Sequence, residues 1–218
     1  LVSGTATITV PTSATTTVTG VPAGTTATLR WTISNGGVCG STFDEVMLVN
    51  YAEPSVANAG TDIEQCNNST FNMSATSPVN GVGLWSLQSG VATIGNPSSP
   101  FTTVTGIAAG TSATLRWTVS NGGCMPTFED IILTNRAPAP TANAGLDQEK
   151  CNDSNFTLSG NNPSPGSGLW TLIAGVATIT SPTNEITTVT GVPVGTSATL
   201  RWTISNGIAC GSTFDDIL

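Results

Sequence analysis

The sequence contains no histidine and only five cationic residues, against 13 acidic ones. The absence of imidazole excludes Ser-His-Asp and Cys-His catalysis, histidine-ligated zinc and the usual proton shuttle near neutral pH. With a formal net charge of −8, the chain has no basic face to neutralise nucleic-acid phosphates or anionic lipid. No run of roughly 18 apolar residues occurs, as a membrane span requires. We therefore predict no nucleic-acid partner, no membrane insertion and no enzymatic activity.

Threonine is abundant: 38 of the 218 residues are Thr, and Gly and Pro add 24 and 13. β-Branched side chains lose rotamer freedom in helices, and Gly and Pro interrupt helices, whereas Thr and Val suit a pleated strand. The composition therefore predicts an all-β chain. Five cysteines in an acidic, lysine-poor chain indicate an oxidising, extracellular setting, although the odd count leaves one sulfur to explain.

The chain repeats itself at a spacing of about 85 residues. The block Thr-Leu-Arg-Trp-Thr-(Ile/Val)-Ser-Asn-Gly occurs three times, and Trp and Cys landmarks elsewhere recur at the same spacing, which is the signature of a tandem array. The copies divide the chain into residues 1–51, the C-terminal part of a truncated repeat; 52–136, a complete repeat; and 137–218, a nearly complete one. We call these the first segment, the middle unit and the last unit. Because the first copy lacks its leading half, we expect the 218 residues to be a window on a longer array.

Short apolar and β-branched runs in the middle unit are separated by Asn, Gly, Pro and Ser clusters. They predict strands at residues 71–75, 83–87, 92–94, 102–105, 113–120 and 131–134, with a leading strand near Val56 or Ile63. About seven strands in one unit is typical of an immunoglobulin-like sandwich. Alternation places Leu115, Trp117 and Val119 on the core face of their strand and the intervening residues on the outer face.

The order of motifs covers the whole chain: Ala-Asn-Ala-Gly-x-Asp, Cys-Asn, Gly-Leu-Trp, Thr-Val-Thr-Gly, the Arg-Trp block, and Phe followed by two acids. This order resembles the PKD-like and immunoglobulin-like repeats of very large surface proteins of gliding Bacteroidota-type bacteria, which include motility-associated adhesins and type IX secretion substrates. The Trp-x-Phe-Gly-Asp-Gly motif of typical PKD domains is replaced here by Leu84-Trp85-Ser86-Leu87 and its copy.

The resemblance implies tandem β-sandwiches arranged end to end, an extracellular location at the cell surface, and a role as a stalk, filament or adhesin. It implies no catalytic residue. The partners it implies are neighbouring repeats of the same long chain, and surface glycans or the secretion and motility machinery.

The cysteines allow two pairing schemes. In the intra-unit scheme Cys66 pairs with Cys124 and Cys151 with Cys210, and truncation leaves Cys39 unpaired. However, the two loops concerned normally lie at opposite ends of an immunoglobulin-like domain, and opposite ends of consecutive domains meet. In the inter-unit alternative Cys66 therefore bridges to Cys210, and the other three bond to neighbours outside the chain. The sequence leaves both schemes open. No Cys-x-x-Cys pair is present, which disfavours a metal site.

The five Trp side chains are predicted to be core residues, since an inward-facing Trp buries a large apolar area. They are Trp31, Trp85, Trp117, Trp170 and Trp202. The Arg beside three of them is predicted to pair across strands with an acid that begins the next strand. An alternative use of the acids is calcium binding, for which the candidates are Asp44, Glu45, Asp62, Glu129, Asp130, Asp147, Asp215 and Asp216. Because no EF-hand spacing occurs, we predict no cofactor, with calcium as the alternative.

Three functions remain open at this point. The first is a non-enzymatic, disulfide-stabilised stalk or adhesive segment. The second is a glycan- or calcium-binding extracellular module, with glycan-binding loops at residues 80–83 and 161–168. The third is self-assembly, in which a neighbour's strands complete the first segment. The sequence disfavours the third, because the chain holds no spare copy of the missing leading half.

Overall fold

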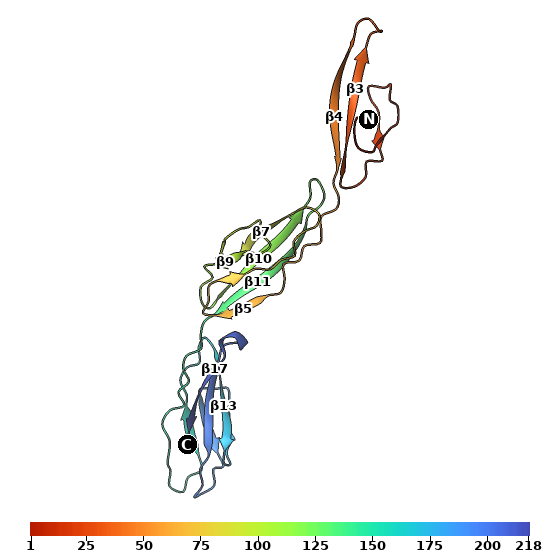
Figure 1. Ribbon diagram of the computed structural model, residues 1–218. Helices are drawn as coiled ribbons and strands as arrows, with labels where there is room; N and C mark the ends of the chain where they lie inside the picture. The colour runs from red at the N-terminus through yellow and green to blue at the C-terminus, as the bar shows by residue number, and fades with distance from the viewer.

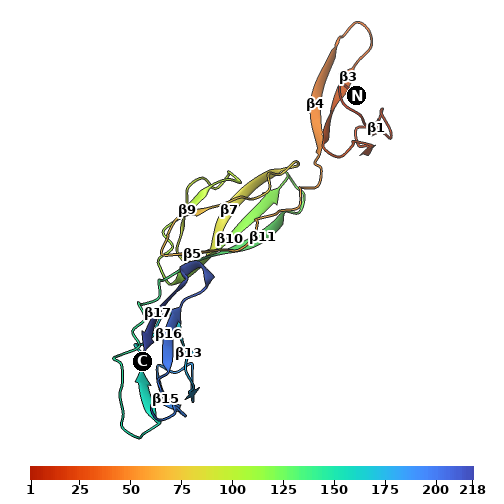
Figure 2. The ribbon, with the colours of Figure 1, turned by 60° about the horizontal axis from the view of Figure 1, so that its bottom comes forward.

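The computed structural model describes all residues, 1–218, and the first segment, middle unit and last unit follow one another along an extended molecule (Figures 1 and 2). Its regular elements are strands and one short 3-10 turn. No helix has the length and apolar character needed to cross a membrane. Tandem β-sandwiches are therefore the architecture of the chain, as the composition and the repeat predict.

Two sheets face each other in the middle unit. One has the order β5-β11-β10-β7 and the other the order β6-β9-β8. The strand bounds are β5 Ile63–Cys66, β6 Phe71–Asn72, β7 Val82–Ser89, β8 Thr93–Ile94, β9 Thr103–Thr105, β10 Thr111–Ser120 and β11 Thr127–Arg136. In chain order this is the immunoglobulin arrangement: the second, fourth and fifth strands share one sheet, and the third, sixth and seventh the other. The first strand, β5, joins the seventh, β11, in parallel.

The seven predicted strands of the middle unit are present, but several boundaries differ: β6 ends at Asn72 rather than Ala75, and the largest shift is at β11. β11 begins at Thr127, four residues before the predicted start at Ile131. The reason is that the polar start of this strand continues the hairpin with β10, where Thr118 pairs with Phe128 and Arg116 with Asp130. Hydrophobicity alone does not reveal this part of the strand, because its apolar residue, Phe128, is exposed and the next two, Glu129 and Asp130, are charged.

The last unit repeats this design with two three-stranded sheets, of order β13-β16-β17 and β12-β15-β14. The bounds are β12 Phe156–Ser159, β13 Ser167–Ala174, β14 Thr178–Ile179, β15 Ile186–Thr190, β16 Thr199–Ser205, the 3-10 turn η1 Ile208–Cys210 and β17 Ser212–Ile217. The middle and last units each have a separate buried core, lying within residues 57–133 and 142–217.

A pair of Trp side chains fills the centre of each core. The ring centroids of Trp85 and Trp117 are 5.0 Å apart, and those of Trp170 and Trp202 are also 5.0 Å apart. All four are at most 2% exposed. Glycine makes room for this packing, because a Cβ atom at Gly83 would lie 2.0 Å from Cζ2 of Trp117. The packing of this core therefore requires a large side chain, Trp117, on β10 and a glycine, Gly83, beside it on β7.

The first segment differs from its two copies. It consists of two two-stranded sheets: β1 Thr7–Ile8 with β2 Val18–Thr19, and β3 Thr25–Ser34 with β4 Ser41–Asn50. The prediction that Trp31 is a core residue was wrong, since Trp31 is 41% exposed. In the middle unit, β7 flanks the strand that carries Trp117 over the whole length around the ring. The strand that carries Trp31 pairs with β4 on one side, and on the other side it has only an isolated bridge between Ser3 and Thr28.

Candidate functional site

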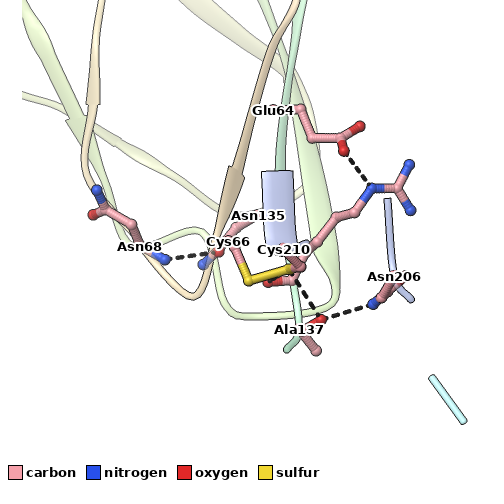
Figure 3. The surroundings of a disulfide bond; sticks show 8 residues. Glu64, Cys66, Asn68, Asn135, Ala137, Asn206 and Cys210 are labelled. Atoms are coloured by element: carbon pink, nitrogen blue, oxygen red, sulfur yellow. Dashed lines mark hydrogen bonds and ion pairs between the residues drawn. A yellow bond between two sulfur atoms is a disulfide. The ribbon is translucent and has the colours of Figure 1, made fainter. Parts of the chain in front are cut away.

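A disulfide joins the middle unit to the last unit. Cys66, the final residue of β5, is bonded to Cys210 in η1, with an S–S distance of 2.05 Å and 4.9 Å between the Cα atoms (Figure 3). β5 brings Cys66 to the end of the middle unit because it pairs in parallel with the C-terminal half of β11, which places Cys66 opposite Arg136. The turn between β16 and β17 carries Cys210 back to the same point. We call this bond and the contacts around it the clasp.

Polar contacts hold the turn of the last unit against the chain that links the two units. The Asn206 side chain donates from Nδ2 to the carbonyl of Ala137 at 2.7 Å, and the Cys210 sulfur lies 3.4 Å from the same oxygen (Figure 3). Between them, Gly207 has a φ of 77°, in the left-handed region, and a Cβ atom there would lie 2.5 Å from Nε of Arg136. Glycine is thus required here both by conformation and by close approach.

The loop that follows Cys66 is fixed to the core by one buried side chain, Asn135, which is 2% exposed. Its Oδ1 accepts a hydrogen bond from the backbone N–H of Asn68 at 3.0 Å, and its Nδ2 donates to the carbonyl of Ile107 at 2.8 Å. A buried amide with both ends satisfied orders its surroundings, because losing either partner leaves a polar group desolvated. The position of Cys66 is therefore set by the interior of the middle unit.

The intra-unit pairing of Cys66 with Cys124 and of Cys151 with Cys210 does not occur in the structure. Cys124 lies in the turn before β11, whereas Cys66 lies beside the last residue of that ten-residue strand, so the two are at opposite ends of the middle unit. Cys210 is bonded to Cys66, and Cys39, Cys124 and Cys151 are free thiols. Of the two schemes that the sequence leaves open, the structure contains the inter-unit bridge.

The joint between the first segment and the middle unit is built in the same way but has no disulfide. Asn121 donates from Nδ2 to the carbonyl of Ala52 at 2.8 Å, and the Cys124 thiol lies 3.5 Å from that oxygen. A side chain at Gly122 would collide with the ring of Tyr51. An Asn-Gly turn whose Asn side chain is hydrogen-bonded to the first residue of its own unit is therefore a repeated element of this protein.

The predicted cross-strand ion pairs are confirmed in all three copies. Arg30 pairs with Glu45 at 2.6 Å, and Arg116 with Asp130 and Arg201 with Asp216 at 2.7 Å each. The sequence did not reveal that each guanidinium also stacks on an exposed ring, at 4.0, 3.8 and 3.7 Å from the centroids of Phe43, Phe128 and Phe214. A row of Phe, Arg and acid on the outer face thus accounts for Glu45, Asp130 and Asp216.

The other calcium candidates accept hydrogen bonds from their own chain. Glu129 and Asp215 accept the backbone N–H of Ala59 and Ala144, at 2.6 and 2.8 Å. Asp62 and Asp147 accept the backbone N–H of Ile132 and Leu218, at 2.8 and 2.9 Å, and Asp44 accepts that of its neighbour Glu45. No group of three or more acidic or Cys side chains lies close enough to hold a metal ion. Most of these acids fasten the leading segment of a unit to its last strand.

The two loops predicted to bind glycans make hydrogen bonds to the leading segment of their own unit. Asn80 donates its backbone N–H to Oγ of Ser55 at 2.9 Å, and its carbonyl accepts the N–H of Ser55 at 3.0 Å. In the last unit, Asn161 donates from Nδ2 to the carbonyl of Thr141 at 3.0 Å and accepts the N–H of Asn143 at 2.8 Å. A cavity of about 420 Å³ lies elsewhere, between Phe156, Leu200 and their neighbours.

Acid is expected to weaken the ion pairs. The hydrogen bond from Arg116 lowers the pKa of Asp130, and those from Arg201 and Arg136 lower the pKa of Asp216 and Glu64. A carboxyl whose pKa is lower in the folded than in the unfolded chain adds stability above its unfolded pKa, and this is lost as the pH falls through its folded pKa. We therefore expect the melting temperature to stay level from neutral pH to about 5 and to fall below about 4.

Thermal melts across this pH range test the expectation, with Asp130→Asn as the matched variant. It removes one of the three carboxyls, so its melting temperature should depend less steeply on pH below about 4 than that of the parent. Equal steepness in the two proteins would show that the Arg116 pair contributes nothing to the acid response.

The strand order and the two cores define the chain as a tandem of immunoglobulin-like β-sandwiches. No family model matches the sequence, and no curated protein is similar to it. Among solved structures, extracellular domains 3–5 of Drosophila OTK are 8% identical over 82% of this chain and 65% of that one, with a TM-score of 0.43. The N-terminal eight Ig domains of DSCAM are 12% identical over 91% of this chain and 32% of that one, with a TM-score of 0.43.

The insect immune protein hemolin is 16% identical over 88% of this chain and 55% of that one, with a TM-score of 0.35. The chain thus spans less than two thirds of each of these three structures. The fold assignment rests on the strand order and the cores of the chain itself, and these distant likenesses add nothing on function.

Proposed function

We propose that this chain is a non-enzymatic structural segment of an extracellular, cell-surface stalk or adhesin, built from repeats at residues 1–51, 52–136 and 137–218. On this proposal the units bear load and set distance, and an adhesive part elsewhere makes the contact. The motif order supports an origin among the surface proteins of gliding Bacteroidota-type bacteria, with type IX secretion and a role in motility or adhesion. The partners are then neighbouring repeats.

The clasp is the observation that carries this proposal. Each core is complete within one unit, so the Cys66–Cys210 bond is not needed to enclose either core. The bond adds a second covalent connection between the two units, whose other covalent connection is the peptide backbone that links them. Two connections restrict rotation between rigid bodies, whereas one leaves relative motion as the usual behaviour of domains with a small interface. A stiff joint suits a part that transmits force and sets distance.

Small-angle X-ray scattering of the oxidised chain and of the Cys66→Ser/Cys210→Ser variant tests this function. We expect the variant to show a broader distribution of interatomic distances, because the joint after Arg136 then bends. The joint after Tyr51 has no disulfide and is an internal reference, since it contributes the same flexibility to both samples. Identical distance distributions would remove the mechanical role of the clasp.

A further inference from the structure

Two of the free cysteines occupy the repeat positions of Cys66 and Cys210, the two cysteines of the clasp. Cys151 occupies the repeat position of Cys66, after the Gln-Glu-Lys run of the last unit, and Cys39 occupies the position of Cys210, in the turn between β3 and β4. Both are exposed. One lies in the last unit and the other in the first segment, so neither can meet the other within a chain as extended as the one in Figure 1.

The backbone around Cys151 already has the shape found at the clasp. Asn67 and Asn152, which directly follow Cys66 and Cys151, are the only non-glycine residues with positive φ, at 49° and 52°. Asn is among the few residues that enter this left-handed region readily. The chain therefore turns in the same way after each of the two cysteines, so this local feature of the clasp is present at Cys151, although the last unit has no strand that corresponds to β5.

The turn that carries Cys39 matches the turn that carries Cys210. Both read Asn-Gly-x-x-Cys-Gly. The glycines have φ values of 71° and 70° at Gly36 and Gly40, and of 77° and 67° at Gly207 and Gly211. The turn of the middle unit is one residue shorter between its Asn and its Cys, and its thiol lies against the Ala52 carbonyl. Cys39 is thus the closer copy of Cys210, and Cys124 is not.

We propose that Cys151 lies at a docking surface for a further unit of the array, and that a second copy of this chain takes the place of that unit when it docks head to tail, so that Cys39 of one copy forms a disulfide with Cys151 of the other. This inference rests on the proposed stalk, because it extends the array by the joint that already connects its units. At the clasp, the Glu64 carboxylate pairs with Arg136 at 2.7 Å and lies against the turn that carries Cys210, since a Cβ atom at Gly207 would be 2.7 Å from its Oε1. Glu149 and Gly36 occupy the positions of Glu64 and Gly207 in the new joint.

The oxidant for this step is a small-molecule disulfide such as oxidised glutathione. The Cys151 thiolate attacks one of its sulfurs, forms a mixed disulfide and releases one small thiol. The Cys39 thiolate then attacks the Cys151 sulfur, and the second small thiol leaves. Two protein thiols and one small disulfide are thereby converted into one protein disulfide and two small thiols.

Two complementary variants test the proposal. Cys39→Ser retains the Cys151 thiol, and Cys151→Ser retains the Cys39 thiol. Each variant alone therefore lacks one partner of the proposed disulfide and should stay monomeric on a non-reducing gel after incubation in a glutathione buffer. Their equimolar mixture should give dimers and nothing larger, whereas the parent chain should give a ladder. Peptide mapping of the dimer should recover the Cys39–Cys151 link. Cys124→Ser should give the same ladder as the parent.

A charge reversal separates docking from simple thiol reactivity. Glu149→Lys leaves both thiols in place but reverses the charge at the position of Glu64, which lies against the turn of the docked unit at the clasp, so we expect a several-fold smaller yield of the ladder. The proposal is overturned if the parent stays monomeric, or if each cysteine variant alone dimerises as well as the mixture. The Cys66–Cys210 peptide in the same digest reports on the stalk proposal separately: its presence without a ladder leaves the stalk standing, and its absence removes the clasp on which both proposals rest.

Discussion

Trp117→Ala is expected to lower the free energy of unfolding of the middle unit by about 3–5 kcal/mol, the range for large aromatic residues in a core. Trp117 is 0% exposed and packs against Trp85. Gly83, on the neighbouring strand, has no side chain that moves into the space left behind. The lost burial is therefore accompanied by a cavity that the surrounding strands cannot close. Hydrogen exchange measured on peptides of each unit, in increasing urea, gives the value for the middle unit alone.

Trp31→Ala is the matched control for this experiment, because Trp31 stands at the same position of the same repeated block. At 41% exposed it loses much less burial, so we expect a change of under about 1 kcal/mol in the first segment. A similar loss in both variants would show that the repeated motif has the same energetic role in every copy, contrary to the difference in packing.

The comparison of these two Trp residues shows what the sequence can and cannot predict. The periodic pattern correctly gives the strand and the face on which each Trp lies, because strand alternation is a local property. It does not give burial, because burial depends on the strands around and opposite that face, and the first segment has only the two-stranded β1-β2 sheet, without counterparts of β6 and β7. Identical local sequence therefore led to one wrong core residue among five.

The disulfide shows the same division between local and long-range information. The spacing of the cysteines is compatible with either pairing scheme. The parallel pairing of β5 with the end of β11, about seventy residues later in the chain, decides between them.

The acidic residues are a further case. Their position at a strand start is visible in the sequence, but Glu129 and Asp215 act on a leading segment whose path is set only by the completed fold.

Reduction of the clasp is expected to destabilise the middle and the last unit together. When the last unit unfolds alone, the disulfide closes the chain between Arg136 and Cys210 into a loop, and when the middle unit unfolds alone it closes the chain between Cys66 and Arg136. Each loop has about 70 residues. Loop-closure entropy for that length corresponds to about 4 kcal/mol, and disulfides typically contribute about 2–4 kcal/mol. One bond therefore raises the free energy of unfolding of both units.

The Cys66→Ser/Cys210→Ser variant and its parent, compared by hydrogen exchange of each unit in urea, measure this effect. We expect losses of about 2–4 kcal/mol in both units and none in the first segment, which lies outside both loops. The Cys124→Ser variant is the control, since it removes a free thiol and no disulfide. A loss of stability in only one unit would contradict this prediction. The disulfide closes a loop in whichever unit unfolds, so removing it should destabilise both.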